Sequence, residues 1–270
     1  MPGTRTDVAS HAGCARMTRA VLLAMVLVTA CTRVDAQSDP PPTPRSAPTA
    51  TRSTSSSTVS DLVVPSFSPT VVVAPSRSGR RPVIVVLHGM GDRAESICPA
   101  FADLVQGRAW IVCPRGTRYQ GAVDRWTYSN DRTVVLTEIN AALRALSLRE
   151  PERADIARPI LSGFSFGAWL VSQIALHSAS EFPRAFAMDT HAVWSREQQS
   201  DYAHHGGRAA LFSCTRDYIR DCRARCRETT TPLRLGCSTM PTLTHGYGHA
   251  YFEALRDRFE QLLATDSRFQ

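Results

Sequence analysis

Short apolar runs rich in β-branched residues alternate along this sequence with longer stretches whose apolar residues recur at helical spacing. The runs are RPVIVVLHG, AWIVCPRG, RPILSGF, RAFAMDTH, RAALFSCTRD and MPTLTHG, between residues 81 and 246. The helical stretches cover residues 94–106, 133–148, 166–179, 195–202 and 250–263. Strands that alternate with helices form a parallel sheet covered on both faces. We therefore expect one α/β domain over residues 76–270, with a mostly parallel, doubly wound sheet.

Residues 1–31 have the pattern of an export signal. Arg16 and Arg19 precede the apolar run AVLLAMVLVTA, which ends at Cys31. A membrane-spanning helix needs ~20 residues, so a basic flank before this shorter run is typical of a secretory signal peptide. Met17 would give that signal peptide a better-proportioned start than Met1.

The ending VTAC, residues 28–31, resembles the lipobox of bacterial lipoproteins. In that family the cysteine is lipidated and becomes the first residue of the mature protein. The resemblance implies a lipid anchor on Cys31 and an exported protein of the cell envelope, periplasmic or on the outer surface. An ordinary signal peptide cleaved nearby, with secretion, is the alternative.

Residues 32–75 are dominated by Pro, Ser and Thr. Such a segment has too few apolar side chains to offset the entropy of ordering, so we expect a disordered tether. The folded unit is expected to begin between Val63 and Arg81.

Six cysteines follow the leader: Cys98, Cys113, Cys214, Cys222, Cys226 and Cys237. An even number in an exported domain predicts disulfides. Cys98 opens the helix after the first strong strand and Cys113 ends the next strand, so these two are expected to pair. For the rest we predict Cys214–Cys222 and Cys226–Cys237, one of three pairings. No CxxC motif accompanies them, so we expect no metal site.

The net charge of +7 comes from arginine, because the chain contains no lysine. Five arginines between residues 216 and 227 are interrupted by acidic residues, which is typical of a solvated helix face. We therefore expect no nucleic-acid partner.

Polar residues suited to acyl transfer follow several predicted strands. The segment LSGFSFGAWL places Ser165 between two glycines where a strand meets a helix. A serine there is either an ordinary helix N-cap or a nucleophile on a sharp strand–turn–helix corner. Other strand ends carry the segment His88–Asp92, Asp189, Asp217 and, nearby, His249.

Two of these motifs resemble the α/β-hydrolase superfamily. VIVVLHGMGDRAES is similar to its oxyanion loop and LSGFSFGAWLVSQIAL to its nucleophile elbow. The pair LHGMGD and GFSFG is most similar to carboxylesterases of the acyl-protein-thioesterase and dienelactone-hydrolase kind. The resemblance spans residues 82–263 and implies a single α/β-hydrolase domain.

The resemblance implies that Ser165 is the nucleophile. The backbone N–H groups of Met90 and Phe166 would then be the oxyanion donors. In this superfamily the histidine of the HG dipeptide, here His88, shapes the oxyanion loop and is not the base. Trp126 is expected to line the substrate cleft, with packing in the core as the alternative.

The acid and the base follow the nucleophile in this superfamily. Asp217 stands just after a strand, where the family keeps its acid; Asp189 and Asp221 are the alternatives. His249 follows a glycine and opens the last helix, as the family's base commonly does. His245 is the alternative base.

The expected activity is that of a serine hydrolase, which cleaves a small-molecule carboxylic ester through an acyl-enzyme and uses no cofactor. About twenty residues separate Asp189 from Ala209. That is too few for a sizeable cap domain, so an open cleft suited to small or flexible esters is expected. A peptidase, a polyester depolymerase and a catalytically silent binding lipoprotein are the alternatives.

Overall fold

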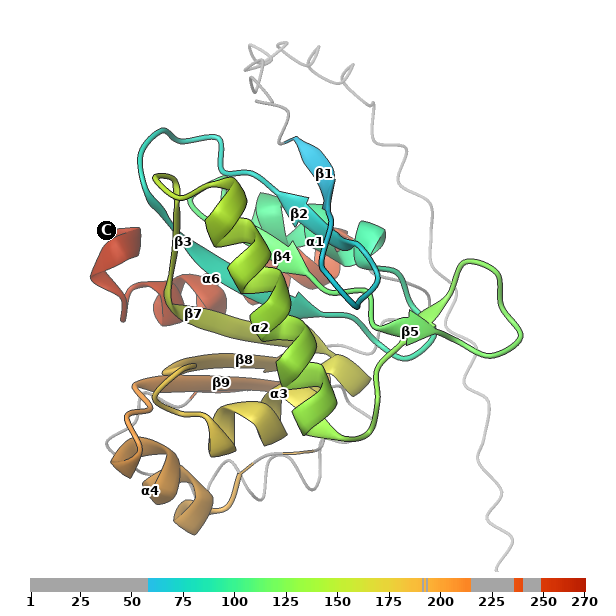
Figure 1. Ribbon diagram of the computed structural model, residues 1–270. Helices are drawn as coiled ribbons and strands as arrows, with labels where there is room; N and C mark the ends of the chain where they lie inside the picture. Colours follow the sequence, from blue (N-terminus) through green and yellow to red (C-terminus); the bar gives the residue numbers. More distant parts are fainter. Residues whose placement is uncertain (1–57, 191, 193, 215–235, 240–248) are drawn as a thin grey trace, which may run out of the picture. The chain divides into compact units, whose positions relative to one another are not determined.

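The computed structural model describes residues 58–270 except 191, 193, 215–235 and 240–248, and these residues belong to one compact unit. An eight-stranded sheet forms its centre, in the order β1-β2-β4-β3-β7-β8-β9-β10 (Figure 1). Its strands are β1 Val59–Leu62, β2 Thr70–Val73, β3 Arg81–Leu87, β4 Trp110–Cys113, β7 Ala154–Phe164, β8 Arg184–Met188, β9 Ala209–Cys214 and β10 Gly236–Thr239. Strand β2 is antiparallel to both neighbours, and all other pairs are parallel.

Helices cover both faces of this sheet. They are α1 Ala94–Leu104, α2 Arg132–Arg149, α3 Phe166–His177, α4 Arg196–His204 and α6 His249–Leu263, with a 3-10 turn η2 at Ser267–Phe269. Helices α2, α3 and α4 pack on one face, and α1 and α6 on the other. The apolar run of strand β3 is unbroken because both faces of the strand are buried. Val83, Val85 and Leu87 face the first group of helices, while Ile84 and Val86 face the second. The predicted α/β fold with a mostly parallel sheet is confirmed.

Two strands lie before the predicted start of the domain at residue 76. Strands β1 and β2 pair with each other, and β2 pairs with β4 at the edge of the sheet. Val71, Val72 and Val73 are all buried. The predicted boundary is therefore too late, because the composition of the surrounding Pro/Ser/Thr-rich segment concealed two short apolar strands.

Smaller differences concern the last strand and a hairpin. The run MPTLTHG, residues 240–246, was expected to be a strand, whereas the described strand β10 is Gly236–Thr239. Residues 240–248 lie outside the described part of the chain. The hairpin of β5, Thr117–Arg118, and β6, Trp126–Thr127, was not predicted. None of the described helices is both long enough and apolar enough to cross a membrane.

The predicted disulfide between Cys98 and Cys113 is confirmed. It joins α1 to β4, with the two α-carbons 6.0 Å apart, and both residues are buried. Cys31, Cys222 and Cys226 lie outside the described residues, and only the backbone of Cys214 and Cys237 is described. The pairings Cys214–Cys222 and Cys226–Cys237 remain predictions.

The parallel strands give the sheet two chemically different edges. Strands β3, β7, β8 and β9 all end at one edge, here called the carboxyl edge, and begin at the opposite one, the amino edge. In open α/β sheets, ligands bind beyond the carboxyl ends of the strands. The connection from β8 to β9 leaves the carboxyl edge and returns to the amino edge through the nine-residue helix α4.

Candidate active site

Ser165 stands at a strained corner between strand β7 and helix α3. Its backbone has φ 52° and ψ −116°, a conformation that costs a non-glycine residue on the order of 1–3 kcal/mol. Its N–H donates to the carbonyl of Met188 (2.9 Å), and its carbonyl accepts from the N–H of Trp169 (3.0 Å). The half-buried side chain makes no capping hydrogen bond to α3. The N-cap interpretation therefore does not account for this serine.

The two flanking glycines are required by close contacts of the main chain. A Cβ at Gly163 would lie 2.6 Å from the carbonyl of Gly167. A Cβ at Gly167 would lie 2.3 Å from the carbonyl oxygen of Leu87 and 2.5 Å from that of His88. Helix α3 thus begins in direct contact with the end of strand β3, which brings Ser165 to the loop that follows β3.

Met90 lies in a tight turn that Trp126 holds in place. The N–H of Asp92 donates to the carbonyl of Gly89 (3.2 Å), which closes the turn. Strand β6 supports it from the side: the N–H of Gly91 donates to the carbonyl of Trp126 (2.9 Å), and Trp126 donates back to Asp92 (3.1 Å). Within the described part of the chain, no hydrogen bond engages the N–H of Met90.

Phe166 is the second residue whose backbone N–H is expected to stabilise an oxyanion. It is the first residue of α3, and the first N–H groups of a helix have no carbonyl one turn earlier to bond. The helix dipole also concentrates partial positive charge at this end. The side chain of Phe166 stacks on Trp169 with ring centroids 5.7 Å apart, and both rings are half-buried beside the corner.

The side chain of His88 packs beneath the Met90 turn. It is fully buried against Tyr128, with ring centroids 4.6 Å apart. Its Nδ1 lies 2.7 Å from the carbonyl oxygen of Gly89, and its Nε2 lies 3.0 Å from that of Arg115. Burial lowers the pKa of His88, although the two carbonyls act in the opposite direction. Both nitrogens face main-chain oxygens, which supports the interpretation of His88 as a structural residue.

The side chain of Trp126 is half-buried, and the guanidinium of Arg118 lies 5.2 Å from its ring centroid. The clear function of Trp126 in the structure is to hold the Met90 turn through its main chain. Its expected role in lining a substrate cleft remains a prediction.

The acid and the base are only partly described. Asp217, Asp221 and His245 lie outside the described residues, and of His249 the structure gives the backbone, at the start of α6. Asp189 directly follows strand β8, next to the Ser165 corner, with φ 56°. Its Oδ1 is buried and has no hydrogen-bond partner among the described residues, while its N–H donates to Ser213 Oγ (3.2 Å).

The environments of buried Glu138 and half-buried Asp92 near the site were not predicted from the sequence. Glu138 on α2 accepts a hydrogen bond from the N–H of Gly116 (2.9 Å), and burial raises its pKa. Burial also raises the pKa of Asp92, whose Oδ2 has no hydrogen-bond partner in the described part of the chain. A signal for Asp92 was its place in the LHGMGD motif, whereas Glu138 lies in an unremarkable helical stretch. Among the described residues, no three His, Cys, Asp or Glu side chains form a group that could hold a metal ion.

No protein-family model and no curated protein matches this sequence significantly. Solved structures do match the fold. A thermostable esterase superposes with a TM-score of 0.52 at 13% identity, over 77% of this chain and 62% of that one. FphF, a fluorophosphonate-binding serine hydrolase of Staphylococcus aureus, gives 0.51 at 11% identity, over 77% and 98%. A ferulic acid esterase gives 0.51 at 14% identity, over 80% and 98%.

At these identities the likeness concerns the fold. The strand order, the mostly parallel sheet and the helices on both faces are those of the α/β-hydrolase fold, to which these esterases and serine hydrolases belong. The chain therefore has an α/β-hydrolase fold, with Ser165 at its strand–turn–helix corner.

Proposed function

We propose that this protein is a serine esterase that cleaves carboxylic esters through an acyl-enzyme on Ser165. The single observation that carries the proposal is the backbone of Ser165. It is held at φ 52° between two glycines, and its side chain does not cap the helix. Strain of this kind persists where a function requires it, and a corner that presents Oγ above the sheet serves a nucleophile.

In the proposed mechanism Ser165 Oγ attacks the ester carbonyl. The negative charge that develops on the carbonyl oxygen would be stabilised by the N–H groups of Met90 and Phe166. Each such donor is worth on the order of 10²–10³ in rate. Their placement is supported by the contact between α3 and the end of β3.

A base must accept the proton of the serine, because a hydroxyl is a poor nucleophile. We assign this role to His249, which would later protonate the departing alcohol and activate water. Asp217 would hold the imidazole in the required tautomer. Asp189 is the alternative acid. Its position beside the corner supports this role, as does a carboxylate oxygen that no described residue hydrogen-bonds.

Small or flexible esters are the proposed substrates. The short β8–β9 connection, with its single nine-residue helix, supports an open cleft on that side. The structural likeness to a ferulic acid esterase and to a fluorophosphonate-binding hydrolase supports ester chemistry in general.

We further propose that the protein is exported and anchored through a lipid on Cys31. The basis is the short apolar run before the VTAC sequence. Cell fractionation of wild type and of Cys31→Ser tests it. Wild type that is fully soluble in the periplasm or the medium would contradict lipidation.

A fluorophosphonate probe and a series of nitrophenyl esters of graded chain length test the esterase proposal. Wild type should be labelled and should hydrolyse short esters, and Ser165→Ala should lose both properties while remaining folded. Ser178→Ala, at the other end of α3, is the matched control and should retain both. Labelling that survives Ser165→Ala, or a wild type inert to every ester, would favour a catalytically silent binding protein.

A further inference from the structure

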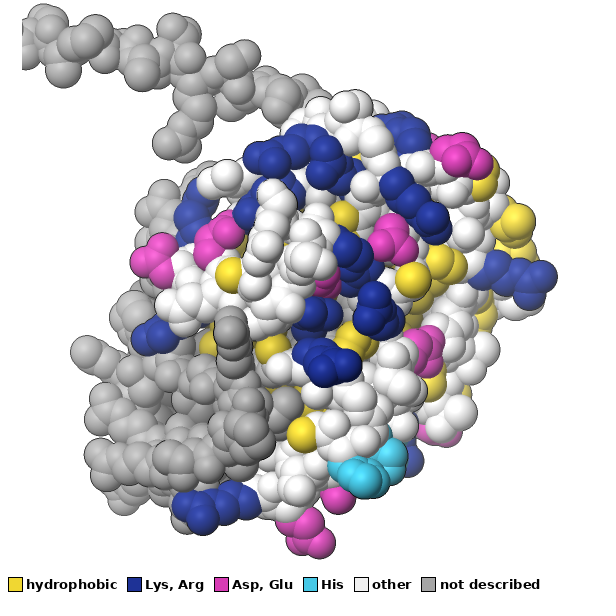
Figure 2. Space-filling model, turned by 90° about the vertical axis from the view of Figure 1, so that its left-hand side faces the viewer, with side chains coloured by type: hydrophobic (Ala, Val, Ile, Leu, Met, Phe, Trp, Pro, Cys, Tyr) yellow, Lys and Arg dark blue, Asp and Glu magenta, His cyan; other side chains and the backbone are white. Residues whose placement is uncertain are grey.

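The amino edge of the sheet, opposite the candidate active site, carries a row of arginines. Arg81 and Arg184 are the first residues of β3 and β8. Arg208 directly precedes β9, and Arg108 lies two residues before β4. Arg158 lies in β7 at the same edge. Figure 2 looks onto this side of the molecule, where arginine side chains gather across the surface.

Connections that reach this edge add further arginines. Strand β2 runs antiparallel to β4, so the β2–β3 connection, with Arg77 and Arg80, lies at the amino edge. Helix α2 ends there, with Arg149 in its last turn and Arg153 in the turn that leads to β7.

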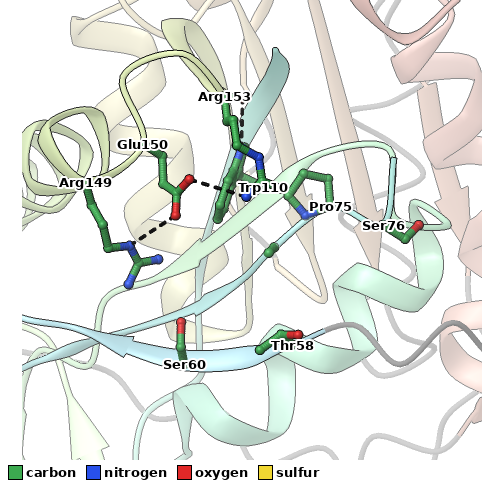
Figure 3. Close-up of a pocket in the computed structure, with 9 residues that line it drawn as sticks. Thr58, Ser60, Pro75, Ser76, Trp110, Arg149, Glu150 and Arg153 are labelled. Carbon is green, nitrogen blue, oxygen red and sulfur yellow. Dashed lines mark hydrogen bonds and ion pairs between the residues drawn. The ribbon is translucent and has the colours of Figure 1, made fainter. Parts of the chain in front are cut away.

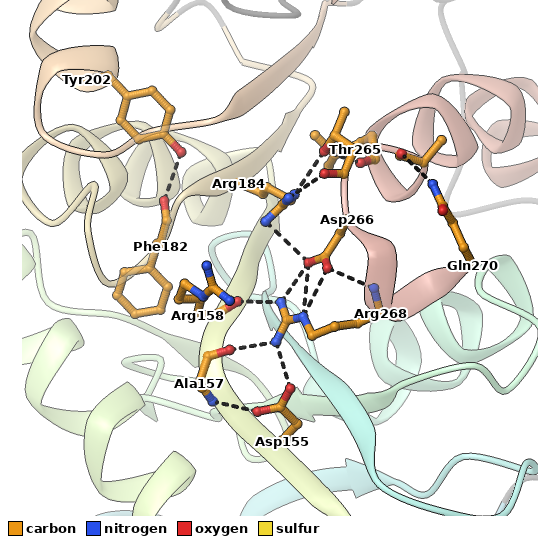
Figure 4. A network of polar contacts seen from close by, with 12 residues as sticks. Asp155, Ala157, Arg158, Phe182, Arg184, Tyr202, Thr265, Asp266, Arg268 and Gln270 are labelled. Atoms are coloured by element: carbon orange, nitrogen blue, oxygen red, sulfur yellow. Dashed lines mark hydrogen bonds and ion pairs between the residues drawn. The ribbon is translucent and has the colours of Figure 1, made fainter.

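Some of these arginines have a structural function. Arg184 and Arg268 both pair with Asp266, at 3.2 Å and 2.6 Å, and Arg268 also pairs with Asp155 at 3.1 Å (Figure 4). Arg108 pairs with Glu260. These contacts attach the C-terminal turn and α6 to the sheet, so they explain part of the row.

Other arginines at this edge have no such explanation. Arg77, Arg80, Arg158 and Arg208 are exposed, and none of them forms an ion pair with a residue that the structure describes. The helix C-termini at this edge favour nearby positive charge, but only by a few tenths to about 1 kcal/mol each. Glu152, in the turn before β7, and Glu181, before β8, are acidic residues of the same edge, but arginine is the commoner charged residue there.

A hollow of ≈470 Å³ lies within this edge (Figure 3). Arg149 and Arg153 flank it, at 3.8 Å and 3.4 Å from Glu150, so the three side chains keep one net positive charge. The guanidinium of Arg153 lies over the ring of Trp110, with its central carbon 5.3 Å from the ring centroid. Thr58, Ser60 and Ser76 also line the hollow, which gives it hydroxyl groups as well as cations.

We propose that the amino edge docks on an anionic phospholipid surface, with the hollow receiving a lipid phosphate. The charge of the edge complements such a surface, and arginine forks bind phosphate well. The course of the chain agrees: β1 runs parallel to β4, so Thr58, where the described chain begins, lies at this edge. An anchor at Cys31 would lead to it. The carboxyl edge and Ser165 then face away from the membrane. The proposal does not depend on esterase activity and holds even if Ser165 is inert.

Vesicle co-sedimentation tests it with the full chain carrying Cys31→Ser, so that no acyl anchor contributes. The test variant combines Arg77→Gln, Arg80→Gln and Arg208→Gln. The matched control combines Arg93→Gln, Arg118→Gln and Arg132→Gln, which remove the same charge from the carboxyl edge. The vesicles are phosphatidylcholine with or without phosphatidylglycerol. The apolar leader is common to all proteins and cancels in the comparison.

A basic residue at an anionic membrane is worth about a fivefold change in binding, so the amino-edge triple should lose on the order of a hundredfold. The control triple should lose less than tenfold, and vesicles without phosphatidylglycerol should bind all proteins equally. Equal losses of vesicle binding in the two triple variants would overturn the proposal. Wild-type binding that is the same with and without phosphatidylglycerol would also overturn it. Release by millimolar inorganic phosphate would instead assign a site for a small anion. If the amino-edge triple has a lower thermal midpoint, the single variants Arg77→Gln and Arg208→Gln replace it.

Discussion

Gly167 leaves no room for a side chain against the main chain of Leu87, so helix α3 starts directly against the end of strand β3. A Cβ on residue 167 would stand 2.3 Å from the carbonyl oxygen of Leu87, closer than packed atoms approach. The corner that carries Ser165 is therefore packed directly against the segment that leads into the Met90 turn.

Gly167→Ala should separate these two segments. We expect a loss of at least 2 kcal/mol in the free energy of unfolding, because backbone atoms cannot move aside cheaply. The rate of ester hydrolysis should fall by more than the loss of folded protein explains, because the N–H of Met90 would shift relative to Ser165. Gly121→Ala is the control: it has φ +79° and open space around it, so it should cost only about 1–2 kcal/mol. Equal effects of the two substitutions would contradict this account.

Ser165→Gly should abolish ester hydrolysis and raise the free energy of unfolding by about 1 kcal/mol, because glycine adopts φ 52° without strain. Ser165→Ala should abolish hydrolysis and keep the strain. Chemical denaturation of both variants measures the difference. If Ser165 were an ordinary N-cap, Ser165→Ala would instead lower the free energy of unfolding by about 1 kcal/mol.

The Cys98–Cys113 bridge should contribute about 3 kcal/mol, because it closes a loop in the unfolded chain. Replacing both cysteines by alanine should lower the free energy of unfolding by that amount and leave the fold intact. Non-reducing peptide mapping checks this bridge together with the predicted pairs Cys214–Cys222 and Cys226–Cys237. Cys98 found free or bonded elsewhere would contradict the structure.

Asp266 should stabilise the protein above pH 4. Burial acts to raise its pKa, but the hydrogen bonds and charges of Arg268 and Arg184 lower it below the usual value. A carboxyl with a lowered pKa loses its contribution as pH falls through the folded-state pKa. Asp266→Ala should cost about 3 kcal/mol at pH 7, because Arg184 loses its carboxylate partner and Arg268 keeps only Asp155. The difference from wild type should shrink below pH 4, which urea titrations at several pH values measure. Glu150→Ala, the control, removes ion pairs that are more exposed than those of Asp266 and should cost about 1 kcal/mol or less.

Glu138 should show the opposite pH dependence. Burial raises its pKa, partly offset by the hydrogen bond from Gly116, so the folded state disfavours the ionised form. Wild type should therefore lose stability relative to Glu138→Gln as pH rises from the usual glutamate pKa of about 4.3 through the raised value. The glutamine still offers an oxygen to Gly116. A pH-independent difference in the free energy of unfolding would show that the carboxyl does not titrate differently on folding.

The sequence by itself determined the fold class and the position of the corner. Periods of two and 3.6 residues in apolar side chains identify strands and helices locally, and alternating elements permit few arrangements other than a parallel sheet covered on both faces. Two glycines around a serine at a strand–helix junction are equally local. The Cys98–Cys113 pairing followed from the order of elements, because both residues lie where consecutive units meet.

The tertiary structure decided what depends on contacts between distant segments. Strands β1 and β2 exist because β4 supplies an edge for β2, which composition cannot reveal. The requirement for glycine at residue 167 comes from the main chain of residues 87 and 88, eighty positions earlier in the sequence. Arginines that are scattered along the sequence lie together because parallel strands begin at the same edge. Local patterns in the sequence indicate strands, helices and short motifs. Strain, close contact and charge clustering arise only when separate segments pack together.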